Sequence, residues 1–229
     1  MFKLPTTCAL FFLALSCTPV FGQVFLEYQT GAATAAGLAP TTAIGVTGSN
    51  VLQGGGLTAN AGGNFSWRDW EPASADFNTA ISQLDFLSWG FIVDSTPAPA
   101  TLMLTNFQIN VDRSGSGPDD FEIRASVNAG PDISLLTHSF NGSSSTANFT
   151  VSLASLPLLT NGDQVEFQLG AFTEVGDPAG SALGTLSLPN DGGFAISTTG
   201  EFTVVPEPAT ATLLALGCVG VGLTRRRRA

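Results

Sequence analysis

Three aspartates near the middle of the chain have the residue type of a calcium site. Asp112, Asp119 and Asp120 bracket a glycine-rich stretch, residues 113–118. Calcium takes about six to eight oxygen ligands, often carboxylates and carbonyls of one loop. These three aspartates are therefore a candidate calcium site. The stretch lacks the residue order of an EF-hand, and the alternative is a hairpin whose aspartates cap the turn.

The same stretch contains the residue type that glycoside hydrolysis requires. Two carboxylates would have to face each other about 5–9.5 Å apart across a cleft. Asp120 and Glu122 share one face of a strand, because alternate residues point to the same side. The Glu-x-Asp-x-x-Glu pattern of jelly-roll glucanases is absent, and His138, the single histidine, has no Gly-x-Ser-x-Gly serine elbow to serve. We expect no enzyme and keep a secreted hydrolase as the second alternative.

Tryptophan side chains offer a different chemistry, the binding of sugars. Their flat faces pack against the C–H faces of sugar rings, while nearby carboxylates accept hydroxyl hydrogens. Trp67 and Trp89 lie in strand patterns, which places them in the core. Trp70, beside Glu71-Pro72, is expected at the surface. It is therefore the candidate carbohydrate contact.

Charge and cysteine content narrow the partners. The chain has 229 residues and a formal net charge of −10, and its central part keeps only the basic residues Arg68, Arg113 and Arg124. So acidic a surface repels nucleic acid and anionic membranes. All three cysteines lie in the terminal segments, so the central part holds no disulfide or thiolate metal site. We expect no nucleic-acid partner and no cofactor apart from the calcium considered above.

The elements that position these residues are predicted to be strands. Apolar and polar residues alternate over residues 121–128, 149–153 and 165–171, the period of half-buried strands. Two apolar patterns change phase, near Thr105-Asn106 and near Leu87-Ser88, which predicts a β-bulge at each. No helical period is visible in the central part. These features predict an all-β fold, an antiparallel β-sandwich that is jelly-roll-like.

The N-terminal 22 residues have the pattern of a secretory signal helix. A short start with Lys3 precedes a mostly apolar run from Leu4 to Val20. Small residues then lead to Gly22, so we expect signal peptidase to cut between Gly22 and Gln23. A lipoprotein acylated at Cys17 is the alternative.

The last 25 residues combine three features in order. Val205 leads into Pro206, Glu207 and Pro208; residues 209–224 are apolar; and Arg225, Arg226, Arg227 and Arg228 follow. The apolar run can enter a bilayer as a single transmembrane helix, and the arginines stay cytoplasmic. At ~1.5 Å per residue the run spans only ~24 Å of a ~30 Å hydrocarbon core. A transient anchor fits this length better than a lasting one.

This three-part tail resembles the PEP-CTERM sorting signal of Gram-negative bacteria. The resemblance covers about the last tenth of the chain. It implies export, a stay in the inner membrane and cleavage near Pro-Glu-Pro by an exosortase-type transpeptidase, often in proteins linked to exopolysaccharide. Residues 112–126, a loop Arg-Ser-Gly-x-Gly-Pro before a strand Phe-x-Ile-Arg-x-Ser, are similar to a recurring element of exported PEP-CTERM proteins. That element implies a β-sandwich of unassigned function. An anchor that is never cut is the alternative.

The predicted organisation has four parts. They are a signal peptide (1–22), a Gly/Ala/Thr-rich segment with short strands (23–64), a β-sandwich body (65–204) and the sorting tail (205–229). The expected protein is exported to the cell surface or extracellular matrix, is not an enzyme and associates with exopolysaccharide. The alternative is a carbohydrate-binding or calcium-dependent lectin-like module.

Overall fold

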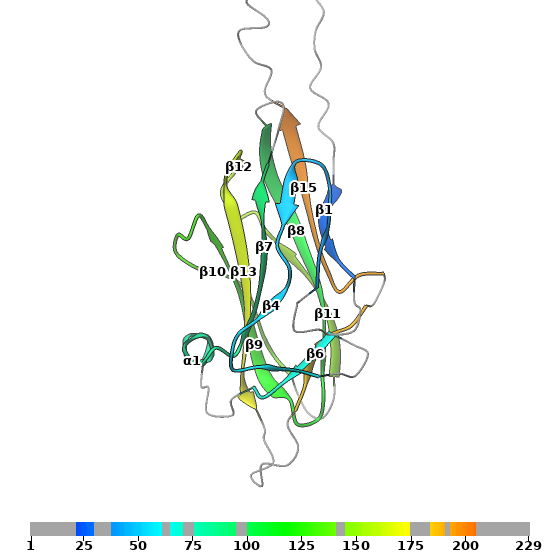
Figure 1. Ribbon diagram of the computed structural model, residues 1–229, viewed down its shortest axis with the longest axis vertical. Coiled ribbons are helices and arrows are strands. Elements are labelled where there is room, and N and C mark those ends of the chain that lie inside the picture. The colour runs from blue at the N-terminus through cyan, green and yellow to red at the C-terminus, as the bar shows by residue number, and fades with distance from the viewer. Residues whose placement is uncertain are drawn as a thin grey trace, which may run out of the picture.

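The described part of the protein is a sandwich of two antiparallel β-sheets with one short helix (Figure 1). The computed structural model describes residues 22–29, 38–60, 65–70, 76–94, 100–140, 145–174, 184–190 and 193–204. The expected signal helix and the sorting tail lie outside these ranges. Within them, no helix has the length and apolar character needed to cross a membrane.

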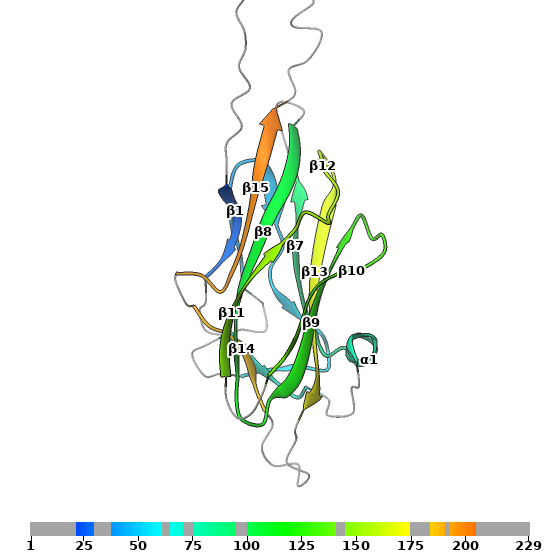
Figure 2. The same cartoon turned by 180° about the vertical axis from the view of Figure 1, so that it is seen from behind.

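The larger sheet has nine strands. Seven follow the order β2-β1-β15-β8-β14-β6-β5, while β11 and β12 also pair with β8. Figure 2 shows β1, β15 and β8 side by side. The bounds are β1 Gln23–Tyr28, β2 Thr41–Thr42, β5 Thr58–Asn60, β6 Phe65–Arg68, β8 Ala100–Arg113, β11 Ser145–Ser152, β12 Leu159–Thr160, β14 Leu186–Leu188 and β15 Ile196–Val204. The first and last strands are neighbours, so this sheet is complete only when both ends of the described chain are in place.

The smaller sheet has six strands. Five follow the order β10-β9-β13-β7-β3, and β4 also pairs with β7. The bounds are β3 Val46–Gly48, β4 Leu52–Gln53, β7 Phe86–Val93, β9 Pro118–Val127, β10 Ile133–Ser139 and β13 Gln164–Glu174. Of the first five strands, β1, β2 and β5 lie in the larger sheet and β3 and β4 in the smaller one. The described part of the Gly/Ala/Thr-rich segment is therefore built into the sandwich.

The alternating patterns place the core as the sequence predicts. The alternating apolar residues of β9, from Phe121 to Ala125, and of β13, from Val165 to Ala171, are at most 1% exposed. Trp89, Phe107 and Phe167 stack between the sheets with ring centroids 5.4–5.9 Å apart. Burying each large apolar side chain contributes roughly 1.5–3 kcal/mol. The interface between the sheets therefore holds the fold together.

Of the two expected β-bulges, one is confirmed. The register between β8 and β15 shifts so that Thr105 has no partner opposite it, as predicted near Thr105-Asn106. The bulge predicted near Leu87-Ser88 is wrong, because β7 pairs with β13 without a shift. Leu84 belongs to a helix end, and the strand begins only at Phe86. Phe86, the first residue of β7, is half-buried on the face opposite the buried Leu87, so the apolar pattern changes phase without a bulge.

The expectation that the central part has no helix is also wrong. Helix α1 spans Phe77–Gln83, and Asp76 caps its start by accepting a hydrogen bond from the Thr79 N–H at 2.8 Å. It ends at Leu84 in the left-handed conformation, with φ 66°. Phe77 packs over Gly170 of β13, where any side chain would collide with the ring. Seven residues are too few to display a clear helical period.

Candidate functional site

A groove of about 300 Å³ lies on the outer face of the six-stranded sheet. Its floor is the outward face of β7, around Ser88, Gly90 and Ile92. One side is β13, with Glu166, and the other is the chain between β3 and β4, with Asn50. Three segments far apart in the sequence therefore build one concave surface.

The chain between β3 and β4 arches over the sheet edge, and buried contacts hold it there. β3 pairs with β7 up to Gly48, and β4 pairs with it again from Leu52. Between them, the Ser49 N–H donates to the Gly90 carbonyl at 2.8 Å. The Tyr28 hydroxyl, fully buried, donates to the Ser49 carbonyl at 2.6 Å. The arch is thus tied to both sheets.

Tyr28 is suited to this role because its hydroxyl stays protonated. Burial raises the pKa of the phenol far above its ordinary value of 10, and this outweighs the lowering by its hydrogen bonds near Gly90 and Ser49. A protonated hydroxyl is a permanent donor to the Ser49 carbonyl. The hydroxyl therefore keeps its proton, and with it this hydrogen bond, across the physiological pH range.

Gly90 gives the groove a floor of bare backbone. A Cβ atom at this position would lie 2.1 Å from the carbonyl oxygen of Val165 on β13. Only glycine allows β13 to approach β7 so closely. The same lack of a side chain leaves the middle of the groove open.

The lining is neutral apart from one carboxylate. Hydroxyl and amide side chains of Thr47, Asn50, Ser88 and Gln164 alternate with the apolar side chains of Leu52 and Ile92, which are 52% and 43% exposed. Glu166 is the one carboxylate among the described lining residues, and it accepts a hydrogen bond from Gln168 at 3.2 Å. The described lining includes no arginine or lysine. Such a surface suits a neutral ligand with many hydroxyls.

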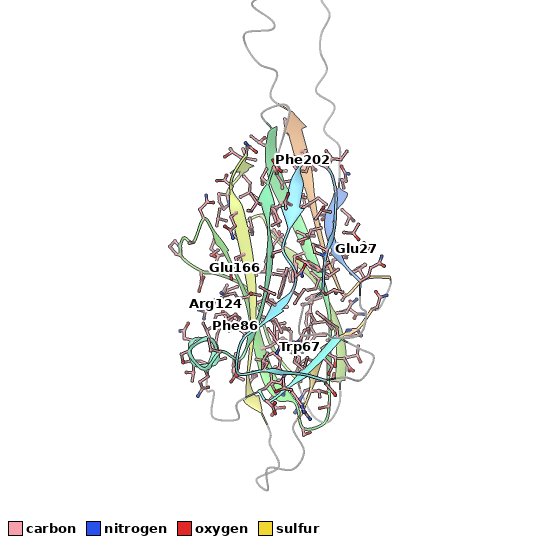
Figure 3. The ribbon with its side chains drawn as sticks, viewed as in Figure 1. Glu27, Trp67, Phe86, Arg124, Glu166 and Phe202 are labelled. Atoms are coloured by element: carbon pink, nitrogen blue, oxygen red, sulfur yellow. The ribbon has the colours of Figure 1, made fainter. Side chains whose placement is uncertain are left out.

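Glycoside hydrolysis would need more than this groove offers. It uses two carboxyl groups about 5–9.5 Å apart, and the described lining supplies Glu166 alone. The face continues from Glu166 toward Arg124 and Phe86 along one flank of the molecule (Figure 3). The described side chains of the groove therefore provide no such pair of carboxyl groups.

The sequence matches no protein-family model and no curated protein. Solved structures similar to it include carbohydrate-binding modules of family 29. One such module is 12% identical, with a TM-score of 0.34 over 83% of this chain and 98% of the module. CBM29_1 from Piromyces equi is 8% identical, with a TM-score of 0.36 over 79% of this chain and 93% of the module. Identity and TM-score are both low, so the ligand of the groove has to be inferred from its own residues.

The structure does not gather the three aspartates of the expected calcium site. Asp112 follows the inward Val111 on β8 and accepts a hydrogen bond from Thr146 at 2.8 Å. Asp120 precedes the inward Phe121 on β9 and accepts one from Ser139. Their side chains therefore leave the sandwich from opposite sheets. Within the described ranges, no three His, Cys, Asp or Glu residues could hold one metal ion.

Asp119, the third of these aspartates, ties the hairpin together instead. It forms an ion pair of 2.5 Å with Arg113, whose side chain is 1% exposed. The Arg113 Nε also donates to the Gly117 carbonyl at 2.9 Å. Ser114 exchanges two hydrogen bonds with Thr185, at 2.7 and 3.0 Å. The hairpin alternative fits this glycine-rich loop.

Trp70, the predicted carbohydrate contact, is not at the surface. It is 0% exposed, and its indole N–H donates to the Trp67 carbonyl at 3.1 Å. Asp69, which directly precedes Trp70, has a φ of 70°, which turns the chain back after β6. This turn carries Trp70 into the core. Trp67 and Trp89 are also buried, as the sequence predicts.

His138 has a packing role. It lies on β10, and its ring is 4.8 Å from the ring of Phe149 and 4.9 Å from that of Phe140. The ring of Phe121 is 5.5 Å away. The single histidine thus fills the seam between the two sheets at one edge.

Glu122 and Arg124 form a structural ion pair on β9. The Arg124 Nε and Nη2 donate to the two Glu122 oxygens at 2.8 and 3.1 Å. Desolvation is the largest influence on Glu122 and raises its pKa, but hydrogen bonds from Arg124 and Ser134 and the arginine charge outweigh it, so the pKa is lowered. The guanidinium also lies 4.1 Å from the centre of the Phe77 ring. The pair thereby fastens helix α1 to the sheet.

The remaining predicted positions lie mostly outside the described residues. Gly22 and Gln23, at the expected signal cleavage, are described, and β1 begins at Gln23. The sorting residues 205–208 and the arginines 225–228 are not described. Sequence reasoning missed the groove itself. The available signal was Gly90, a glycine within a mostly apolar strand, which marks a close backbone approach.

Proposed function

We propose that this protein is a non-catalytic extracellular module that binds a neutral polysaccharide in the groove over β7. The observation that carries the proposal is the lining: hydroxyls, amides and one carboxylate beside exposed Leu52 and Ile92. Sugar hydroxyls pair with such polar groups, and the C–H faces of the rings pack on apolar side chains. An anionic chain would meet Glu166 and find no cation in the described lining.

The test is binding of saccharides to the full chain in mild detergent. Isothermal titration calorimetry with neutral hexasaccharides would measure affinity, and affinity electrophoresis would compare neutral with acidic polysaccharides. Replacing Glu166→Ala removes a central acceptor, so we expect about tenfold weaker binding, which corresponds to about 1.4 kcal/mol. Leu52→Ala should weaken binding by removing part of the apolar surface.

The matched control is Glu201→Ala on β15. Glu201 is also half-buried, but it lies on the outer face of the nine-stranded sheet, opposite Met103. Its replacement should leave saccharide affinity unchanged. Equal losses at Glu166 and Glu201, or binding of acidic polysaccharides only, would refute the groove as the site.

We propose further that the tail sorts the protein to the cell surface or matrix. Pro206-Glu207-Pro208, the apolar run 209–224 and the arginines 225–228 support this, together with the signal pattern before Gln23. Signal peptidase and an exosortase-type transpeptidase would be the processing partners, and exopolysaccharide the natural ligand. We also propose that the sandwich is wound like a jelly roll, that residues 1–22 form a signal helix and that residues 209–224 form a transmembrane helix.

Mass spectrometry of both chain ends tests the sorting. A mature form that starts at Gln23 and ends near Val205–Pro208 outside the cell is expected. A membrane-bound form that still carries Arg225–Arg228 would replace sorting with a plain C-terminal anchor.

A further inference from the structure

One edge strand of the nine-stranded sheet differs from the other edges. β11 runs along β8 for eight residues in unbroken register, from Ser145 opposite Arg113 to Ser152 opposite Asn106. No other described strand pairs with it. The other described strands with a single partner are two or three residues long, or, like β10, carry a register shift. Short or irregular edges prevent unwanted pairing, and β11 has neither feature.

The backbone of β11 is suited to accept another strand. The Leu153 N–H, just after β11, donates to the Thr105 carbonyl of β8. Because successive residues alternate in direction, Phe149 and Val151 also bond toward β8. Thr146, Thr150 and Ser152 therefore direct their N–H and C=O groups away from the sheet. β11 contains no proline, glycine or charged residue, the residue types that commonly block an edge.

The side-chain pattern of β11 is complementary to a second copy of β11. In an antiparallel pair centred on Phe149, Ala147 of one copy lies opposite Val151 of the other, and Thr146 lies opposite Ser152. Apolar residues then face apolar ones, and polar residues face polar ones. The chain carries a net charge of −10, so an uncharged strand is where two acidic copies can approach with little repulsion.

We propose that β11 pairs with β11 of a second copy about a two-fold axis at Phe149, joining two nine-stranded sheets into one. In this register the outward Thr146 of each copy exchanges backbone hydrogen bonds with Ser152 of the other, and the outward N–H of Thr150 lies between these two ends. Phe149, half-buried beside His138 and Phe121, would be covered by its counterpart. The groove lies on the other sheet and stays open in both copies. The pairing does not depend on what the groove binds.

Sedimentation of the full chain in mild detergent, over a range of concentrations, tests the pairing. We expect a twofold rise in mass for the wild type and for Thr150→Val, which keeps the N–H. Thr150→Pro removes an outward N–H that β8 does not use, so the fold should persist, checked by circular dichroism, while the mass stays that of a monomer. A wild type that stays monomeric, or a Thr150→Pro variant that still dimerises, would overturn the proposal.

A cysteine crosslink tests the register. In a background with Cys8→Ser, Cys17→Ser and Cys218→Ser, Phe149→Cys places two thiols opposite each other. Cα atoms of a non-hydrogen-bonded pair lie about 4.5 Å apart, within the disulfide range. Thr146→Cys, on the same strand but opposite Ser152, is the control. We expect a rapid dimer band for Phe149→Cys alone, and equal rates for both variants would overturn the two-fold register.

Discussion

The acidic hairpin, residues 112–122, and the groove lie in the same sandwich but use their residues in opposite ways. In the hairpin, charged side chains bond to neighbours within the fold, as Arg113 does to Asp119. In the groove, mostly neutral side chains from three distant segments face outward around Gly90. The cluster of charged residues in the hairpin therefore stabilises the fold through internal ion pairs and hydrogen bonds. A binding surface can arise from residues that look unremarkable one by one.

The largest expected effect comes from breaking the hairpin. Arg113→Ala removes a buried guanidinium and leaves Asp119 and the Gly117 carbonyl without their partner. We expect the free energy of unfolding to fall by about 2–3 kcal/mol, less than for a fully buried pair because Asp119 is about one third exposed. Urea denaturation measures it.

The exposed Arg68 provides the control for this variant. Arg68→Ala should change stability by less than about 0.5 kcal/mol. Saccharide affinity of folded Arg113→Ala should equal that of the wild type, because the hairpin is separate from the groove. A hairpin variant that keeps its stability but loses binding would reverse the comparison.

A smaller effect is expected from loosening the groove. Tyr28→Phe removes the hydrogen bond to the Ser49 carbonyl that holds the arch. Unfolding free energy should fall by about 1 kcal/mol, and saccharide binding should weaken roughly threefold, about 0.7 kcal/mol. Calorimetry measures both quantities. Ser49→Ala, which removes only the weaker 3.2 Å bond to the Gly90 carbonyl, should have less effect, and the reverse order would refute Tyr28 as the anchor.

The smallest effect concerns pH. The pKa of Glu122 in the folded chain lies below its ordinary value of 4.5, so its contribution to stability is present above that pH. The contribution is lost as pH falls through the folded pKa. Between about pH 5 and pH 3, Glu122→Gln should therefore lose less stability than the wild type, with a difference below about 1 kcal/mol. Identical acid denaturation curves would show that the pair contributes nothing.

Much of the sandwich could be predicted from the sequence, because alternation alone assigns the faces of β9 and β13. The bulge at Thr105 followed from the same rule, since an apolar face must stay inward. The rule failed at Leu87-Ser88, because Leu84 belongs to a helix end and Phe86 lies on the outward face of the strand. It also failed at Trp70, because the positive φ of Asp69 reverses the chain. Neither the short helix nor the turn leaves a period in the sequence.

The sequence by itself determined the charge, the neutral edge strand, the alternating strand faces and the terminal patterns that predict export. These depend on residue types within a few positions of one another. Only the tertiary structure decided that the aspartates leave from opposite sheets, that Tyr28 holds Ser49 and that Gly90 becomes the floor of a groove. Each of those depends on strand order and register, which bring together residues tens of positions apart.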